Sequence, residues 1–170
     1  VLGSVADRVM RRASCPVLAI CKAPLDCTAG EERHHVHHLN RILYCTDFSE
    51  NSEPALNYAI SATDEYDAEL TLLHVLEEIP SPAMKAEAIA TATQQLDKLI
   101  PTKERKKLKI KTAVRIGKPY QQIIQFAQEL QIDMVTMGVS GRGALDRAVF
   151  GATTYRVIQL GPCPVLAVHA

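Results

Sequence analysis

The chain has 170 residues, of which 47% are apolar, and this length and composition suit one domain with a sizeable core. Its 19 basic and 19 acidic residues give a net charge of zero, which excludes the strongly basic surface typical of nucleic-acid-binding proteins. No apolar run approaches the roughly 20 residues that cross a bilayer, so no membrane partner is expected. Five cysteines without a CxxC pair favour a reducing, cytoplasmic environment.

The beginning of the chain repeats its end. Residues 3–20 read GSVADRVMRRASCPVLAI and residues 151–168 read GATTYRVIQLGPCPVLAV, with eight identities at a constant offset of 148 positions. A repeat with a fixed offset indicates duplication of a whole unit, and only the second copy has the rest of its unit ahead of it. The sequence therefore predicts a C-terminal remnant of a preceding repeat at 1–21, a turn-rich linker at 22–39 and one complete domain at 40–170.

The remnant is predicted to form a helix at 4–13 and a strand at 16–21. This strand is too apolar to stay in water, so it should pair with the last strand of the domain, in the same chain or in a neighbour. Cys15 and Cys163 are equivalent in the repeat, and both suit buried, small apolar positions.

The complete domain alternates strand-like and helix-like segments, which predicts a parallel sheet with helices on both faces. Ser52 is the predicted N-cap of the first helix. The alternation of apolar and polar residues in 108–115 is typical of a strand at the sheet edge, and the basic run 103–107 before it is interpreted as a solvated face. Strands are expected at 40–46, 68–76, 108–115, 132–137 and 164–169, and helices at 52–63, 83–100, 119–130 and from 151 to 161.

The glycine-rich stretch from Gly138 to Thr153 carries the strongest chemical signal. In an open parallel sheet, ligands bind outside the carboxyl ends of the strands where the strand order reverses, and Gly138 and Gly141 lie at such an end. Glycine lets backbone amides approach an anion, and Gly151 opens a helix whose free N–H groups attract phosphate. Glycines at strand ends are also often plain turns, so spacing alone leaves both interpretations open.

The pattern Gly-x2-Gly-x9-Gly followed by a small residue resembles the ATP-binding signature of the universal stress protein family. The similarity extends over essentially all of 40–170, and includes YCTDFSENS at 44–52, LLHV at 72–75, IDMVTMG at 132–138 and CPVLAV at 163–168. The resemblance implies a doubly wound, Rossmann-like α/β fold with a five-stranded parallel sheet of order 3-2-1-4-5. It also implies a homodimer, formed through the edge of the fifth strand at 164–169.

The resemblance also assigns an adenine corner and a phosphate end. Asp47 resembles the position that reads adenine, with Cys45 and Thr46 beside it and Val75 against the base. The remaining matches are Met137 and Gly138 at the ribose end, and Gly141, Arg142, Gly143, Gly151, Ala152 and Thr153 at the phosphate end. The residues alone leave a second role open for Asp47, as an acceptor for the amides at the start of the first helix. Arg142 equally suits a phosphate contact or plain exposure.

One position departs from the family pattern. ATP-binding members usually have Ser or Thr after the glycine that opens the last helix, and this chain has Ala152. A hydroxyl hydrogen bond to a charged group is worth about 1.5–3 kcal/mol, so we expect phosphate binding to be weakened roughly tenfold to a hundredfold. Thr153, one residue on, is a candidate substitute.

The resemblance thus implies a cytoplasmic stress-response module that binds ATP or AMP, with or without Mg, and acts as a homodimeric sensor. Two alternatives stay open: an interaction module that binds no nucleotide, and a slow ATPase. No Ser-His-Asp or Cys-His arrangement can be assembled, so no catalytic residue is assigned. His74 is interpreted as a hydrogen-bonded residue of the core or its rim. The linker histidines are interpreted as solvated rather than as metal ligands, namely His34, His35, His37 and His38.

Overall fold

The computed structural model describes residues 3–20, 39–79, 81–139 and 151–169. Its helices are α1 (Ser4–Arg12), α2 (Glu53–Tyr66), α3 (Lys85–Leu99), α4 (Thr102–Lys107), α5 (Pro119–Glu129) and α6 (Ala152–Leu160). Its strands are β1 (Val17–Ala19), β2 (Arg41–Cys45), β3 (Glu69–Leu76), β4 (Lys109–Ile116), β5 (Met134–Gly138) and β6 (Val165–Val168). Two short 3-10 helices, η1 (Glu50–Ser52) and η2 (Pro82–Met84), precede α2 and α3.

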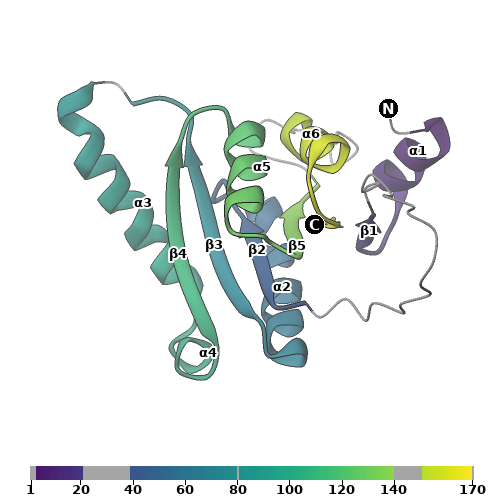
Figure 1. Cartoon of the computed structure of the whole chain (residues 1–170), viewed down its shortest axis with the longest axis horizontal. Coiled ribbons are helices and arrows are strands. Elements are labelled where there is room, and N and C mark those ends of the chain that lie inside the picture. The colour runs from purple at the N-terminus through teal and green to yellow at the C-terminus, as the bar shows by residue number, and fades with distance from the viewer. Residues whose placement is uncertain (1–2, 21–38, 80, 140–150, 170) are drawn as a thin grey trace, which may run out of the picture.

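The strands form one sheet in the order β1-β6-β5-β2-β3-β4 (Figure 1). Strands β2 to β6 are parallel, and β1 is antiparallel to β6. If the strands of the domain are numbered from β2 as the first to β6 as the fifth, their order across the sheet from the β4 edge is 3-2-1-4-5. The predicted doubly wound sheet is therefore confirmed, with β1 as an added sixth strand.

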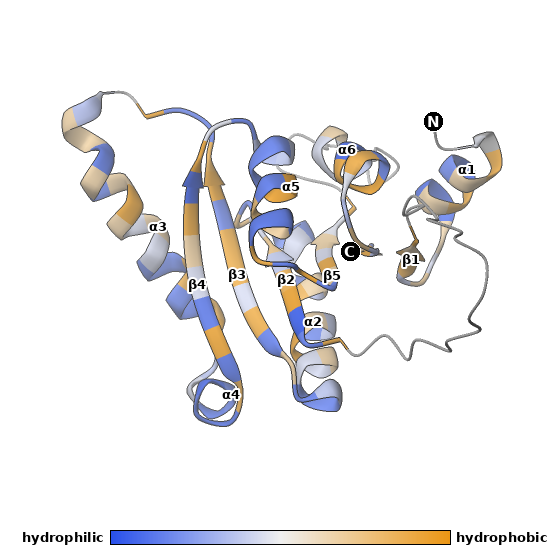
Figure 2. Cartoon of the chain, viewed as in Figure 1, coloured by the Kyte–Doolittle hydropathy of each residue, from blue (hydrophilic) through white to orange (hydrophobic). Residues whose placement is uncertain are grey.

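Helices cover both faces of this sheet because its central strands are apolar on both sides. In β2, Leu43 and Cys45 pack into a core cluster with α5 and α6, whereas Ile42 and Tyr44 pack into a second cluster with α2 and α3. A run of apolar residues without polar alternation is typical of a parallel strand buried on both faces. The difference between central and edge strands is visible in Figure 2, where β3 is largely hydrophobic and β4 alternates.

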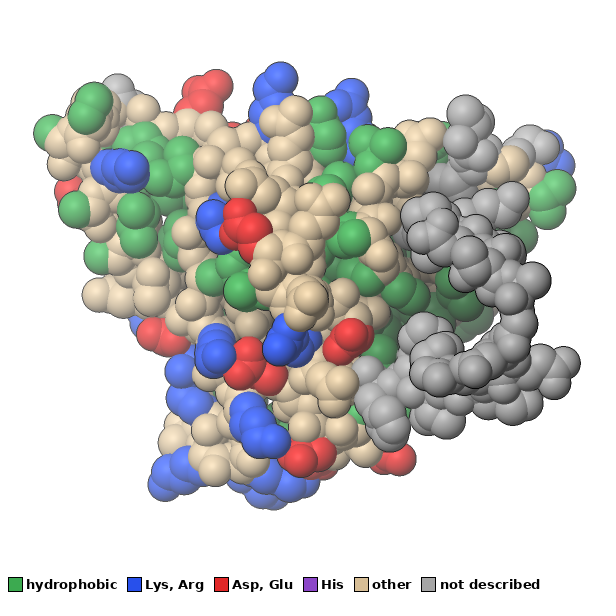
Figure 3. Space-filling view, viewed as in Figure 1, with side chains coloured by type: hydrophobic (Ala, Val, Ile, Leu, Met, Phe, Trp, Pro, Cys, Tyr) green, Lys and Arg blue, Asp and Glu red, His purple; other side chains and the backbone are tan. Residues whose placement is uncertain are grey.

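The edge position predicted for 108–115 is confirmed, since β4 ends the sheet beside β3. Lys109 and Lys111 are exposed along this edge, and Lys111 Nζ lies 2.7 Å from a carboxylate oxygen of Glu69 on the neighbouring strand. Charged side chains on an edge strand discourage pairing with another sheet. On the face shown in Figure 3, basic and acidic side chains are interspersed rather than gathered by sign.

The N-terminal segment docks onto the domain as a helix and a strand. β1 pairs with β6 in the register Val17↔Ala167, Leu18↔Leu166 and Ala19↔Val165, and Met10 of α1 is buried in the cluster that contains α5 and α6. The predicted pairing of 16–21 with 164–169 is confirmed within the same chain. As a consequence the fifth strand of the domain is not the edge of the sheet, and the edge expected to form a homodimer is occupied by β1.

The basic run 103–107 is largely exposed, which confirms its interpretation as a solvated face, and it lies in helix α4 because Lys, Glu and Arg favour helix when nothing breaks it. Three local predictions need correction. Strand β5 begins at Met134, since the Ile132 amide still bonds the Ala127 carbonyl at the end of α5. Ser52 is the N-cap residue of α2, but its side chain makes no capping bond. Cys15 is exposed, whereas Cys163 is buried as expected.

Candidate functional site

The strand order reverses between β2 and β5. Strand β2 pairs with β3 on one side and with β5 on the other, and Cys45↔Met137 is the last residue pair of the β2–β5 ladder. Open α/β sheets bind ligands in the crevice outside the carboxyl ends of strands at such a switch point. The structure thus brings two predicted site residues, Cys45 and Met137, into one row at this point.

The loop that follows β2 is held by a network of short hydrogen bonds. Thr46 Oγ1 lies 2.9 Å from Ser52 Oγ and accepts the Phe48 N–H at 2.9 Å. Ser52 Oγ donates to the Ser49 carbonyl at 2.7 Å, which explains why it does not cap α2. Tyr44 Oη donates to the Ser52 carbonyl at 3.0 Å, and burial raises the pKa of this phenol. The hydroxyl of Thr46 therefore orders the loop.

Asp47 uses its carboxylate within the same loop. Its Oδ1 accepts the Ser49 N–H at 3.0 Å and the Ser49 hydroxyl at 2.6 Å. The intervening residue, Phe48, has a left-handed backbone with φ of 62°, and this turns the chain back over the carboxylate. Asp47 therefore accepts the Ser49 amide near the start of the first helix. This is the second role that the sequence left open for Asp47.

His74 supports this loop from the neighbouring strand. Its Nδ1 donates to the Thr46 carbonyl at 2.8 Å, and its ring centroid lies 4.3 Å from that of Phe48. The interpretation of His74 as a hydrogen-bonded residue is confirmed. Its pairing with Phe48 was missed, because two residues far apart in the sequence give no local pattern that joins them. Val75, the next residue of β3, is half-buried and packs against the α5–α6 side of the core.

The start of α6, which the resemblance assigns to a phosphate end, is hydrogen-bonded to the end of β5. The Gly151 N–H donates to the Val139 carbonyl at 2.7 Å, and Thr154 Oγ1 donates to the Gly138 carbonyl at 2.9 Å. The first N–H groups of a helix have no acceptor within the helix, and they carry the positive end of its dipole. The amides of Ala152 and Thr153 in this first turn therefore lie close to the switch point.

Thr154 is a positioning residue that the sequence analysis missed. The sequence offers little to indicate this role, because Thr154 is the third small or hydroxyl-bearing residue in a row after Gly151, following Ala152 and Thr153. Its buried hydroxyl is used by the Gly138 carbonyl. Ala152 is exposed and Thr153 is half-buried, and both stand in the first turn of α6 as predicted. Gly141, Arg142 and Gly143 lie outside the described residues.

Gly138 has a packing reason to be glycine. A Cβ at this position would lie 2.6 Å from the Asn51 carbonyl oxygen and 3.2 Å from the Ser52 Cα atom. The end of β5 thus touches the backbone of η1 directly. For this glycine, the close approach of two backbone segments is by itself sufficient to require the absence of a Cβ.

Cys45 is a core residue as well as a neighbour of the site. The Cys45 thiol is buried, and this burial raises its pKa, with a smaller contribution from the nearby thiol of Cys163. The Cys45 thiol therefore stays protonated near neutral pH. Within the described residues, no group of three or more His, Cys, Asp or Glu could hold a metal ion. No helix in the described part of the chain is long and apolar enough to cross a membrane.

A doubly wound α/β domain with a helix N-terminus at its switch point defines a class of Rossmann-like proteins. The sequence model of the Universal stress protein family matches residues 38–169, and the chain belongs to this family. The universal stress protein MJ0531 of Methanocaldococcus jannaschii is 31% identical over 137 residues, which cover 75% of this chain and 81% of that protein.

Three solved structures show how the fold recurs. The structure of MJ0577, also from Methanocaldococcus jannaschii, is 28% identical with a TM-score of 0.69, and the match covers 77% of this chain and 96% of that one. A universal stress protein in complex with cAMP has 20% identity and a TM-score of 0.55, with 78% of this chain and 98% of that chain covered. A universal stress protein from Archaeoglobus fulgidus, at 23% identity and a TM-score of 0.66, covers 99% of this chain over 54% of its own length.

Proposed function

We propose that this universal stress protein binds an adenine mononucleotide, ATP or AMP, in the crevice at the carboxyl ends of β2 and β5. The observation that carries the proposal is the attachment of α6 to β5. The bonds from Gly151 to Val139 and from Thr154 to Gly138 fix the N-terminus of a nine-residue helix beside the switch point. Backbone N–H groups so placed suit an anionic phosphate.

The β2–β3 side of the proposed site suits a flat, amino-bearing ring. Val75 offers an apolar side chain at the end of β3, and the carboxylate of Asp47 is an acceptor for an exocyclic amino group. The Thr46–Ser52 network and the contact between Phe48 and His74 hold this carboxylate in place. The proposed arrangement places the base on the β2–β3 side and the phosphates on the α6 side.

The family supports the same ligand class. The fold carries an adenine nucleotide in the relative whose structure is a complex with cAMP. We propose that Gly141, Arg142 and Gly143 complete the phosphate end, as the family signature implies. If Mg²⁺ takes part, we propose that it enters bound to the phosphates, since the described residues offer no cluster of ligands of their own.

The chain is proposed to act as a cytoplasmic binding module, with a slow ATPase as the alternative in the enzyme class. Protein purified without added nucleotide should release an adenine nucleotide when it is denatured and examined by mass spectrometry. Protein that yields none, and that gives no binding heat with ATP, AMP or adenosine, would contradict the proposal and favour an interaction module. Steady release of phosphate over hours would assign the ATPase instead.

Ala152→Ser tests the phosphate end directly. The restored hydroxyl should tighten ATP binding about tenfold to a hundredfold, and adenosine binding should change little, because adenosine has no phosphate to contact. Thr153→Ala is the matched variant at the next position, and a loss of ATP affinity there would show that Thr153 already supplies the hydroxyl. Equal effects on ATP and adenosine would place Ala152 away from the phosphates.

The homodimer stays a separate prediction. Because β1 already pairs with β6, a dimer through 164–169 must either displace β1 or exchange it between two copies. Sedimentation over a range of protein concentrations will show whether the chain is monomeric or dimeric.

A further inference from the structure

The two copies of the repeat meet across a local twofold axis. Leu18 pairs with Leu166, which is its own counterpart at the offset of 148 positions, and the flanking pairs, Val17↔Ala167 and Ala19↔Val165, exchange under the same rotation. α1–β1 and α6–β6 are therefore equivalent units that face each other. Only α6–β6 has a sheet on its far side, since β1 ends the sheet of the described strands.

The same repeat positions are buried in one copy and exposed in the other. Val157 of α6 is 1% exposed, whereas its counterpart Val9 of α1 is 52% exposed. Val168 at the end of β6 is 1% exposed, whereas its counterpart Ile20 is 76% exposed. The N-terminal unit thus presents to solvent the apolar positions that the C-terminal unit uses to hold its sheet.

These exposed positions lie on opposite faces of the strand layer. Val157 belongs to the core cluster with α5, and Val168 belongs to the cluster with α2. A single helix or strand laid against α1–β1 would cover Val9 or Ile20, but not both. An occupant that buries both must have a layer on each face of its own strands, which is the architecture of an α/β sheet.

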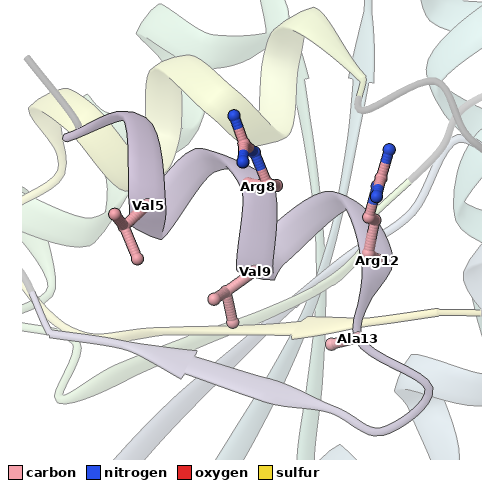
Figure 4. Close-up of a pocket in the computed structure, with 5 residues that line it drawn as sticks. All are labelled: Val5, Arg8, Val9, Arg12 and Ala13. Carbon is pink, nitrogen blue, oxygen red and sulfur yellow. The ribbon is translucent and has the colours of Figure 1, made fainter.

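The α1 side of this surface is hollowed and carries positive charge. Val5, Val9 and Ala13 line a hollow of about 460 Å³ together with Arg8 and Arg12, and the two valines point away from the two arginines (Figure 4). The equivalent arginine of the C-terminal unit, which is covered by the sheet and α5, shows which contact such a side chain makes when a neighbour lies over it.

Arg156, the counterpart of Arg8, has its guanidinium carbon 4.6 Å from the ring centroid of Tyr120 on α5. A cation over an aromatic face is a favourable contact. The occupant of the hollow should therefore present an aromatic ring on a helix that lies beside α1.

We propose that α1–β1 docks a second α/β sheet of the universal stress protein type that lacks its own last helix and strand. The occupant's last strand would run parallel to β1 along its free edge, as β5 runs parallel to β6. A second copy of this chain is not the expected occupant, because β6 already fills the corresponding edge of β5. In keeping with this, the Archaeoglobus fulgidus structure follows 99% of this chain, including the N-terminal unit, over only 54% of its own length.

The proposal is tested by supplying such a sheet. A copy of residues 39–150 is joined directly ahead of Gly3, so that it precedes α1–β1 as the original precedes α6–β6. Amide hydrogen exchange in residues 5–20 should then be slower than in the parent chain, by about tenfold or more, because the unit becomes buried. Circular dichroism should show added helix, and sedimentation should show a monomer of the larger mass. An added body that stays unfolded, or exchange as fast as in the parent, overturns the proposal.

Two substitutions show whether the protection uses this surface. Val9→Lys should abolish the slowing in the extended chain, and it should leave the parent's stability unchanged because Val9 is 52% exposed there. Tyr58→Lys, at a residue of α2 that is 45% exposed, is the matched control and should keep the slowing. Full protection in the Val9→Lys variant would overturn the proposal. Self-association of the parent that Val9→Lys removes would overturn it too, by assigning the surface to a second copy. Nucleotide-free buffer keeps this test separate from the proposed binding function.

Discussion

Gly138→Ala should destabilise the domain, because the added Cβ meets backbone atoms that cannot rotate away. It would lie 2.6 Å from the Asn51 carbonyl oxygen, 3.2 Å from the Asn51 carbonyl carbon and 3.2 Å from the Ser52 Cα atom. Strand β5 lies between β2 and β6, and η1 is held by Tyr44 and Thr46, so neither segment is free to move alone.

The expected loss is about 2 kcal/mol in the free energy of unfolding. Forcing an extra methyl into a packed site typically costs about 1–3 kcal/mol, and backbone atoms place this site toward the upper end. Replacing glycine also restricts the unfolded chain, which offsets about 0.4–1 kcal/mol. For a protein of this size, about 2 kcal/mol corresponds to a fall in Tm of roughly 4–8 °C.

Gly3→Ala is the matched control, since a Cβ on Gly3 would have nothing within 4 Å. Urea unfolding followed by circular dichroism should place this control within about 0.5 kcal/mol of the parent. Equal stability of the two variants would refute the packing argument. If Gly138→Ala kept its stability but lost ATP affinity, the glycine would serve ligand approach, as the sequence pattern first indicated.

Three further outcomes are expected. Thr154→Val should cost about 1–3 kcal/mol in urea unfolding because it leaves a buried carbonyl at the end of β5 without a donor, whereas Thr153→Val should change stability little. Gly141→Val should abolish ATP binding in a calorimetric titration with the free energy of unfolding unchanged; unchanged affinity would remove Gly141 from the site. The folded-state pKa of Cys45 is raised, so its contribution to stability is complete below the thiol's unfolded pKa of about 8.5 and falls as pH rises above it. Urea unfolding between about pH 8.5 and 10.5 should therefore show a shallower loss of stability in Cys45→Ala, and identical pH profiles would contradict this.

Several features of the fold could be predicted because they are written in short-range patterns. The alternation of strand-like and helix-like segments indicated a parallel sheet with helices on both faces, and the alternation of apolar and polar residues in 108–115 indicated an edge strand. The repeated CPVLA block predicted that the N-terminal strand would pair with the last strand, and it does so in the same chain. These predictions hold because periodicity and repetition report directly which faces of an element are apolar.

Two predictions about the surroundings of a single side chain were wrong. Ser52 was expected to cap α2, but its hydroxyl bonds the Ser49 carbonyl and Thr46 instead. Cys15 was expected to be buried like Cys163, yet nothing in the described structure covers it. In both cases the residue type suited the expected role, and a competing partner or the lack of a neighbour decided the outcome.

By itself, the sequence determined the order of the strands and of the long helices and the family, and it predicted the region of the sheet where a ligand would bind. Local propensity, apolar periodicity and the glycine spacing are properties of neighbouring residues, and they can be read without coordinates. Only the tertiary structure decided that Gly138 contacts the backbone of η1, that the Phe48 ring packs against His74 and that Thr154 links α6 to β5 by a hydrogen bond. Only the tertiary structure also showed that Val9 is exposed where its repeat counterpart is buried. These facts depend on which segments meet after folding. Equivalent positions of the two repeat copies acquire different surroundings because β6 has a neighbouring strand on both sides, whereas β1 ends the sheet of the described strands.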